Sequence, residues 1–231
     1  MTGHTRALLL GVAAGFWLAA SQSAIASTIV PTPGYAPGIG YEFGVTMSGN
    51  DHAVYQGSVG AKSWNEPANP PDAKGWTHTS DWTAIELTEA TTLTVTLARQ
   101  SGVPFTLPNG TVVIEGDLLT PALSLYAGWE TTGPETHTFN PTGNISWASE
   151  LTYLAHEDNP LSLTSITRTF ELAAGKYSII YGGNPSDPTV TGFHGYQATL
   201  STVPLPAAAW LFGSGVAGLL AWAKSRRSYT A

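Results

Sequence analysis

The chain has 231 residues, no cysteine, 25 glycines, 16 prolines and only 11% charged residues, with a formal net charge of −7. The absence of cysteine excludes a disulfide scaffold, a cysteine nucleophile and thiolate metal sites. Nine basic residues against sixteen acidic ones exclude a protein that binds nucleic acid by neutralising its phosphates. A mean hydropathy near zero with so little charge indicates that apolar residues are concentrated in particular segments, and these lie at the two ends.

Residues 1–26 have the pattern of a secretory signal peptide. Arg6 precedes an apolar run over 7–20, and the small residues Ala24 and Ala26 precede a predicted cleavage site before Ser27. The alternative is an uncleaved transmembrane anchor, but the apolar run is shorter than the roughly 20 residues that a membrane span needs. We therefore expect export through the Sec translocon, with the signal helix removed.

Residues 27–202 are expected to form one β-sandwich domain. Short runs alternate apolar and polar residues with a period of two and are rich in β-branched side chains, and no segment shows a convincing helical period. Such runs, separated by turn signals, are typical of an all-β, antiparallel sandwich. In chain order, strands are predicted at 41–47, near Val54, and at 84–88, 92–97, 112–114, 122–126, 166–172, 176–181 and 193–202.

The connections between these strands are of two kinds. Residues 88–91 and 173–175 are short enough to be turns, and the first is predicted to join its strands as a hairpin. Residues 49–81 and 130–161 are predicted to be long loops, the second with a helical turn around 147–154. A loop of that length in a compact domain is either functional or locally structured.

Motifs of catalysis are absent from this body. It has no Gly-x-Ser-x-Gly string for a serine nucleophile and no histidine spacing typical of zinc. His156, Glu157 and Asp158 form a polar triplet that we interpret as a solvated loop, with a metal-binding role as the alternative. We therefore predict that the protein is not an enzyme. A secreted hydrolase with an unrecognised pair of carboxylates is the alternative.

Calcium is the ion that the sequence favours, because oxygen ligands cluster in two places. The first cluster comprises Asn109, Glu115 and Asp117, and the second Asn184 and Asp187. Neither has the spacing of an EF-hand. No other cofactor is predicted.

Tryptophans in the predicted loops are candidates for ligand binding. Trp64 and Trp76 lie in loop 49–81, and the run from Gly75 to His78 is the best candidate for a binding loop. Exposed indole rings on a β-sandwich can stack on sugar rings. The alternative, which we favour for most of them and above all for Trp82, is that they cap the core, since tryptophan is highly buried on average.

Residues 203–231 form the second apolar end. Residues 207–223 carry no charge and would form a helix about 26 Å long, sufficient for a bilayer core. The basic residues that follow should stay cytoplasmic, so everything before the helix should face outward. The alternative, a buried helix of the soluble domain, does not suit a segment without a polar face. The basic residues are Lys224, Arg226 and Arg227.

This tail resembles a PEP-CTERM sorting signal of the VPLPA type. The resemblance rests on the motif, the apolar helix and the basic cluster, in that order. It implies recognition by an exosortase, transient insertion in the inner membrane, cleavage near the proline motif, and delivery to the cell surface or extracellular matrix. The motif itself comprises Val203, Pro204, Leu205, Pro206 and Ala207.

The body resembles the bacterial pre-peptidase C-terminal-like β-sandwich. The resemblance is carried by the strand runs 82–87, 92–95 and 121–126, by the Gly175-x-Tyr177 turn and by the closing run 195–200. It implies a jelly-roll-like accessory module of secreted bacterial proteins, and it implies a fold without a catalyst.

Two functions follow as hypotheses. The first is an exported, non-enzymatic protein of the cell surface or extracellular matrix, processed by an exosortase. The alternative is a carbohydrate-binding module that retains matrix exopolysaccharide through Trp64, Trp76 and His78. Five basic and sixteen acidic residues give the body from 27 to 204 a net charge of −11, which again excludes nucleic acid as a partner.

Overall fold

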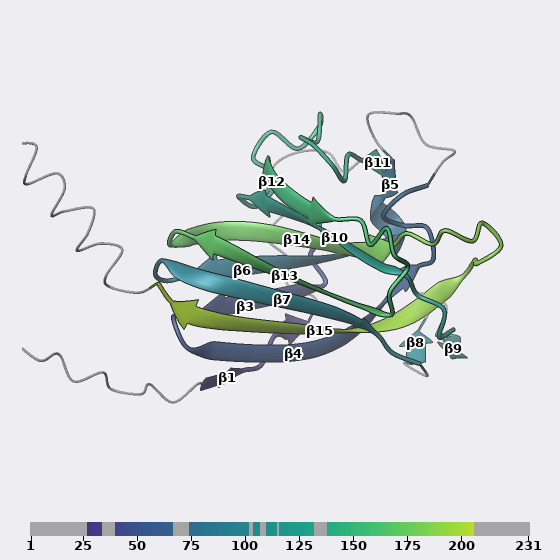
Figure 1. The fold of residues 1–231 in the computed structure, drawn as a ribbon, viewed down its shortest axis with the longest axis horizontal. Helices are drawn as coiled ribbons and strands as arrows, with labels where there is room; N and C mark the ends of the chain where they lie inside the picture. The colour runs from purple at the N-terminus through teal and green to yellow at the C-terminus, as the bar shows by residue number, and fades with distance from the viewer. Residues whose placement is uncertain are drawn as a thin grey trace, which may run out of the picture.

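The computed structural model describes residues 27–33, 40–66, 74–101, 104–106, 110–114, 116–131 and 138–205. Two main sheets pack face to face and form an all-β sandwich, as predicted (Figure 1). Most neighbouring strands are antiparallel, but the pairs β1–β4 and β3–β6 are parallel, which corrects the purely antiparallel prediction. The likeness to a jelly roll stays a prediction, as do the flanking helices, which fall outside the described residues.

The five-stranded sheet has the order β1-β4-β15-β7-β13, and the six-stranded sheet has the order β12-β10-β14-β6-β3-β2. The first comprises β1 (Ser27–Ile29), β4 (Asp51–Gly60), β7 (Thr91–Arg99), β13 (Ser165–Leu172) and β15 (Phe193–Pro204). The second comprises β2 (Thr32–Pro33), β3 (Phe43–Met47), β6 (Asp81–Leu87), β10 (Pro121–Ala127), β12 (Thr152–Glu157) and β14 (Gly175–Gly183). Two small pairs join β5 (Gly75–Trp76) to β11 (Thr138–Phe139) and β8 (Pro104–Thr106) to β9 (Val112–Ile114), and a 3-10 turn, η1, spans Thr77–Thr79.

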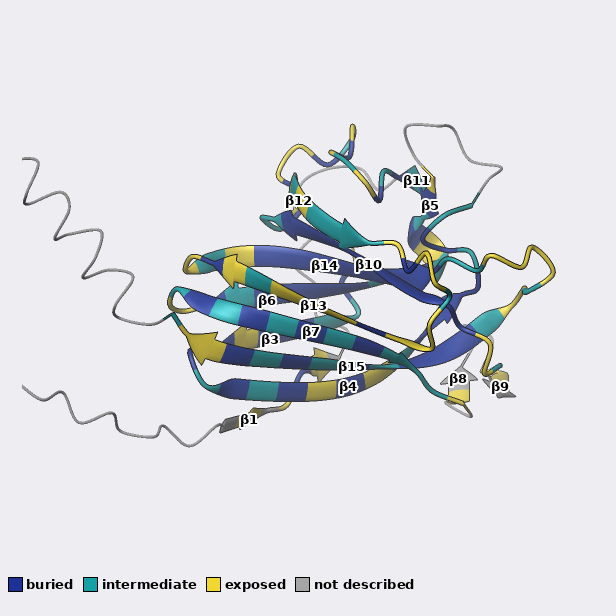
Figure 2. Cartoon of the chain, viewed as in Figure 1, coloured by how far each residue is buried: buried dark blue, intermediate teal, exposed yellow. Residues whose placement is uncertain are grey.

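The main core lies between the two sheets. Alternation along each strand directs the apolar side chains inward: in β7, Leu93, Val95 and Leu97 are fully buried, while the threonines between them are partly exposed. Their partners across the interface include Leu123 and Leu125 of β10. The dark and light bands along β7 and β15 in Figure 2 show this alternation.

A second core lies on the other face of the six-stranded sheet. There, Trp82, Tyr126 and Ile180 of three adjacent strands are covered by residues of the chain between β10 and β12. The covering side chains include Phe139 of β11, Ile145 and Leu151. Both faces of this sheet are therefore buried, which explains the uninterrupted burial along β10.

Both short connections cross between the sheets. The strands β6 and β7 flank residues 88–90 but belong to different sheets, so the predicted hairpin is wrong. Residues 173–174 likewise lead from β13 in one sheet to β14 in the other. The physical reason is that each strand must bury its apolar face. Ile85 of β6 and Leu93 of β7 both do so in the main core, each from its own sheet.

Both segments predicted to be long loops contain strands. The ten-residue strand β4 occupies the first, where glycines obscured the inward alternation of Ala53 and Tyr55. The second contains β11 and β12, and residues 145–151 form turns where a helical turn was expected. The start of the body, for which no strand was predicted, forms β1 and β2.

The strand pairing distinguishes the two ends of the sandwich. Ser27 pairs with Asp51 and Pro204 with Thr91, so β1 begins and β15 ends at the same end, which we call the terminal end. We call the opposite end, where β4 ends and β15 begins, the cleft end. Figure 1 shows β15 running from one to the other.

Within the described residues, no helix has the length and apolar character needed to cross a membrane. The segment 207–223, predicted to be such a helix, lies outside them.

Candidate functional site

A cleft of about 470 Å³ opens at the cleft end of the sandwich. Three segments form its walls: the turn 60–66 after β4, the segment 76–79 that contains η1, and residues 191–193 before and within β15. Its volume lies in the range of small-molecule sites, which hold about 300–1,000 Å³. The cleft is thus the described feature best suited to hold a ligand.

Backbone hydrogen bonds hold the three walls together. Ala61 N–H donates to the carbonyl of Gly192 at 2.8 Å, and Trp76 N–H donates to the carbonyl of Ser63 at 2.7 Å. The hydroxyl of Ser80 donates to the carbonyls of Trp76 at 2.8 Å and of Ser63 at 3.2 Å. Because the bonds join all three segments, the cleft is preorganised.

Gly183 allows the turn after β4 to lie against the end of β14. A Cβ atom at this position would lie 2.0 Å from the carbonyl oxygen of Ala61, a backbone atom that cannot move aside cheaply. Only glycine permits so close an approach. The turn is fixed further by Trp64 N–H, which donates to the Gly183 carbonyl at 3.1 Å.

The side chains in the cleft combine two aromatic rings with a few polar groups. Trp76 and Phe193 are both half-buried and line the cleft from different segments. Hydroxyl groups are supplied by Thr79 and Thr191, whereas the buried Ser63 hydroxyl accepts the Gly183 N–H at 3.1 Å. The charged groups are Lys62 and Glu66. An apolar lining with a small number of polar groups is typical of small-molecule sites.

Asp187 belongs to the loop that leads into the cleft wall at 191–193. The hydroxyl of Thr189 donates to its carboxylate at 2.7 Å and the Thr189 N–H at 2.9 Å. These two bonds, together with the positive charge of Lys62, lower the pKa of the Asp187 carboxyl from its usual value. The two hydrogen bonds from Thr189 thus fix the Asp187 carboxylate within its own loop.

A buried polar network links the two sheets below the cleft. The Tyr196 hydroxyl donates to Asp81 at 2.6 Å, and the hydroxyls of Tyr55 and Tyr181 lie 2.8 Å apart. Burial raises the pKa of all three tyrosines, most clearly for Tyr181 and Tyr196. They stay neutral at physiological pH, so the network is structural.

The structure separates the residues predicted to bind a ligand. Trp76 lines the cleft, and the exposed His78 follows it on η1 without lining the cleft. Trp64 is only 3% exposed, and its indole N–H donates to the Ser124 hydroxyl at 2.8 Å. Its prediction as a ligand-binding residue is wrong, because its ring packs inside the domain behind the cleft.

Three other tryptophans pack against the core, which is the interpretation that we favoured for most of them. Trp82 is 3% exposed, and Trp129 and Trp147 are half-buried against the second core. The indole N–H of Trp147 donates to the Thr138 carbonyl at 2.7 Å, and Lys176 lies 4.4 Å above the Trp129 ring. None of the three lines the cleft.

Lys62 and Phe193 are among the cleft residues that sequence reasoning missed. Phe193 was assigned only to the start of the last strand, and Lys62 lay in a predicted loop. No local signal identifies them, because the contact between their segments depends on the pairing of β4 with β15.

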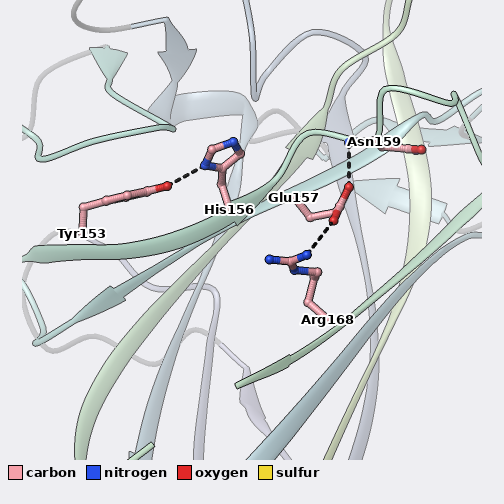
Figure 3. Close-up of polar contacts among 5 residues, drawn as sticks. All are labelled: Tyr153, His156, Glu157, Asn159 and Arg168. Atoms are coloured by element: carbon pink, nitrogen blue, oxygen red, sulfur yellow. Dashed lines mark hydrogen bonds and ion pairs between the residues drawn. The ribbon is translucent and has the colours of Figure 1, made fainter. Parts of the chain in front are cut away.

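The polar triplet at 156–158 lies elsewhere, at the open edge of the sandwich (Figure 3). His156 and Glu157 belong to β12, so the interpretation of the triplet as a loop is wrong for them. His156 accepts or donates a 2.5 Å hydrogen bond with the Tyr153 hydroxyl. Glu157 lies 3.5 Å from Arg168 of β13, which joins the edge strands of the two sheets. The contacts are structural.

Within the part of the chain that the structure describes, no three histidine or carboxylate side chains lie close enough together to hold a metal ion. Of the first calcium cluster, Asp117 is exposed, and Asn109 and Glu115 lie outside the described residues. In the second, the Asn184 amide N–H donates to the Asp158 carbonyl at 2.6 Å. Calcium stays a prediction, tested by melting with and without chelator.

The predicted processing sites fall partly outside the described residues. Val203 and Pro204 are the last residues of β15, where Thr91 donates a 2.7 Å hydrogen bond to the Val203 carbonyl. Leu205 follows the strand. Ser27 begins β1. The residues outside the description are Ala24, Ala26, Pro206, Ala207, Lys224, Arg226 and Arg227.

The fold thus defines a two-sheet β-sandwich with a cleft at one end. No protein-family model matches the chain, and no curated protein matches it. Solved structures are similar to the chain, and three of them illustrate the range of similarity. CorA, a surface-associated copper-binding protein of Methylomicrobium album BG8, has 16% identity and a TM-score of 0.46, with 70% of this chain and 98% of that one covered.

The other two are more distant. The pre-peptidase C-terminal domain of collagenase from Bacillus anthracis has 11% identity and a TM-score of 0.33, with 68% and 94% covered. The secreted copper-binding protein MopE of Methylococcus capsulatus has 12% identity and a TM-score of 0.36, with 78% and 99% covered. A pre-peptidase domain is thus among the similar structures, whereas no family model supports the PEP-CTERM resemblance. Structural similarities at such low sequence identity assign no function to the chain.

Proposed function

We propose that this protein is exported, has no enzymatic activity and binds a carbohydrate of the cell surface or extracellular matrix in its cleft. The observation that carries the proposal is that Trp76 and Phe193, from different parts of the chain, line one preorganised cleft with hydroxyl groups beside them. Trp76 was one of the predicted binding residues and stays one. Phe193 takes the place of Trp64.

The chemistry of a sugar ring suits this lining. A pyranose ring has an apolar C–H face and a rim of hydroxyl groups. The C–H face packs on an aromatic ring, and the rim needs hydrogen-bond donors and acceptors in fixed positions. The hydroxyls of Thr79 and Thr191 provide both.

The position of the cleft suits a protein presented at a surface. The predicted sorting motif begins at Val203, near the end of β15, whereas Phe193 begins the same strand at the cleft. A strand rises about 3.3 Å per residue, so the ten steps from Phe193 to Val203 along β15 separate the two by roughly 33 Å. A tail held in the inner membrane before exosortase processing would leave the cleft facing away from that membrane.

Titration of the full-length protein with the exopolysaccharide of its own cell, followed by calorimetry, tests the binding. We expect Trp76→Ala to weaken binding by about tenfold or more, because the main stacking surface is lost. Trp129→Ala is the matched control, since Trp129 is also half-buried but lies toward the terminal end beside Tyr177. Absence of binding by the unmodified protein would overturn the proposal.

Two further measurements test the other parts of the proposal. Mass spectrometry of the protein at the cell surface should find a C-terminus near Pro204, whereas an intact Arg227 would show that no exosortase-type processing occurs. Incubation with panels of glycans, esters and peptides should release no product, and turnover of any of them would show that the protein is an enzyme.

A further inference from the structure

We propose that the carbohydrate is an extended, neutral polysaccharide, and that its chain continues from the cleft across the outer face of the five-stranded sheet. The inference rests on the proposed function, because it names the class of carbohydrate and a second surface that binds it. Three features of the sheet support it: the register of its strands, the absence of charge on this face and the side chains that the face presents.

The cleft lies where the pairing of β4 with β15 begins. Phe193 of β15 and Gly60 of β4 are opposite each other in register, and both line the cleft. Further along β15, Gln197 and Thr199 are partly exposed and lie on the same side of the strand as Phe193, because side chains alternate between the two faces of a sheet. A chain bound beside Phe193 can therefore continue along the solvent side of the same strand.

The outer face beyond the cleft carries no charged residue over three cross-strand rows, which we call the neutral face. Each row crosses β4, β15, β7 and β13 in that order, so the three rows hold 3 × 4 = 12 residues (Figure 1). The rows begin on β4 at Gln56, Val54 and His52 and end on β13 at Ser165, Thr167 and Thr169.

None of these twelve residues is Asp, Glu, Lys or Arg, although the body carries sixteen acidic and five basic residues. On β13, Glu171 falls in the next row, beside Thr92, and Arg168 pairs with Glu157 of the other sheet. A charged polymer would find no opposite charge on this face, so it suits a neutral ligand.

The side chains of the neutral face suit a polymer rich in hydroxyl groups. Seven of the twelve carry a hydroxyl and two carry a carboxamide. The hydroxyls of Thr96 and Thr167 lie 2.9 Å apart, so one donates to the other, and the second O–H of the pair is left for a ligand. The amides of Gln56 and Gln197 lie on opposite residues and form no hydrogen bond with another described residue. Each amide can therefore both donate to and accept from a sugar hydroxyl.

The size of the neutral face favours a narrow chain over a second copy of the protein. Strands about 4.8 Å apart and rows about 6.6 Å apart give the face a backbone grid of roughly 14 Å by 13 Å. A stable protein interface buries about 800 Å² on each partner, several times the area of this grid. A polysaccharide chain is only one sugar ring wide, and its path along β15 from Phe193 to Ser201 would be about 26 Å long.

Ligands of two lengths test whether binding extends beyond the cleft. The probes are the disaccharide and octasaccharide fractions obtained by partial hydrolysis of the exopolysaccharide of its own cell, titrated into the full-length protein by calorimetry. A double variant, Gln197→Ala with Thr199→Val, removes one amide and one hydroxyl from the neutral face and leaves every cleft residue unchanged. Thr152→Val is the matched control, because Thr152 is also an exposed strand residue but belongs to β12 of the other sheet.

We expect the octasaccharide to bind at least about tenfold more tightly than the disaccharide, because only the longer chain reaches the neutral face. The double variant should weaken binding of the octasaccharide by about tenfold and leave the affinity for the disaccharide unchanged. Thr152→Val should change neither affinity. Added sodium chloride should leave both affinities unchanged, because salt screens only interactions between charges.

Failure of this inference and failure of the proposed function give different results. Equal affinities for the two lengths, or an octasaccharide affinity that the double variant does not change, would overturn the extended surface and leave binding in the cleft intact. A fall in affinity with added salt would overturn the neutral ligand. A dimer in sedimentation velocity that the double variant abolishes would assign the neutral face to a second copy instead. If neither fraction nor the intact exopolysaccharide binds, the proposed function is overturned as well.

Discussion

The outer faces of the two sheets are built in opposite ways. On the five-stranded sheet the outer face is open to solvent, and threonines of adjacent strands bond to each other there, with Thr94 and Thr169 hydroxyls 3.1 Å apart and Thr96 and Thr167 hydroxyls 2.9 Å apart. On the six-stranded sheet the outer face is covered by Phe139, Ile145, Ala148 and Leu151, which form a second core with it. One sheet thus has a single buried face, and the other has two.

This difference teaches where the stability of the domain resides. A residue on the covered face loses contact with water and must pack or form hydrogen bonds, as Ser124 does by donating to the Pro141 carbonyl at 2.6 Å. A residue on the open face keeps its contact with water. A substitution on the covered face should therefore lower the free energy of unfolding more than a substitution of the same kind on the open face.

The largest effect is expected at Phe139, which is fully buried and meets Trp82 edge to face with ring centroids 5.7 Å apart. Phe139→Ala should lower the free energy of unfolding by about 3–5 kcal/mol, because it leaves a cavity in the second core. Val54→Ala, on the open face, should cost less than about 1 kcal/mol. Urea denaturation measures both, and equal losses would show that the cover does not act as a core.

An intermediate effect is expected from deleting one hydroxyl on each face. Ser124→Ala should cost about 1–3 kcal/mol, because the buried Trp64 indole N–H loses its acceptor. Thr96→Val also removes a hydroxyl but keeps the β-branched shape on the open face, and it should change stability by less than about 0.5 kcal/mol. Thermal melting of both variants checks the comparison, and a larger loss for Thr96→Val would contradict it.

Alkaline pH should test how tightly the cover, which comprises Phe139, Ile145, Ala148 and Leu151, is held against the six-stranded sheet. Burial raises the pKa of Tyr126 in the second core and of Tyr181 in the main core. The folded state keeps both hydroxyls protonated, whereas an unfolded tyrosine ionises near pH 10. Stability is thus unaffected below about pH 10 and falls above it by about 1.4 kcal/mol per pH unit for each protected tyrosine.

Tyrosinate absorbance during an alkaline titration distinguishes the two layers. If the cover opens before the domain unfolds, Tyr126 ionises before Tyr181, and Tyr126→Phe removes the earlier step. We expect this order, because the cover consists mainly of turns and short strands. A single cooperative step containing both tyrosines would show that cover and sandwich unfold together.

The smallest effect is expected at the ion pair between the edge strands. The side chain of Arg168 is 46% exposed and that of Glu157 is 22% exposed, so solvent screens their attraction. Arg168→Gln should cost less than about 1 kcal/mol. A double-mutant cycle with Glu157→Gln measures the coupling. A larger coupling would show that the open edge of the sandwich depends on this pair.

The same contrast explains which strands the sequence predicted well. Along β7 and β13 one face is buried and the other is exposed to solvent, so apolar and polar residues alternate. Both strands were therefore predicted close to their bounds. In β4, glycines interrupt the alternation, and only a short strand near Val54 was expected. The cover of the second core has no period at all, which is why residues 130–161 read as a loop.

The candidate site was predicted less well than the fold. Trp76 was identified because it lies in a predicted loop, where an exposed indole ring could stack on a sugar. Trp64 looked equivalent in sequence, yet it is buried against Ser124 while Trp76 lines the cleft. Their different environments arise from contacts with β10 and with β15, which are distant in sequence.

By itself, the sequence determined the all-β class, the inward faces of the alternating strands and the charge of the body, because these depend on local periodicity and composition. Only the tertiary structure decided which connections cross between sheets, which face is covered and which residues share the cleft. Those depend on pairings such as Gly60 with Phe193, which no local pattern specifies. Lys62 and Phe193 thereby come together at one end of the sandwich, although 131 positions separate them.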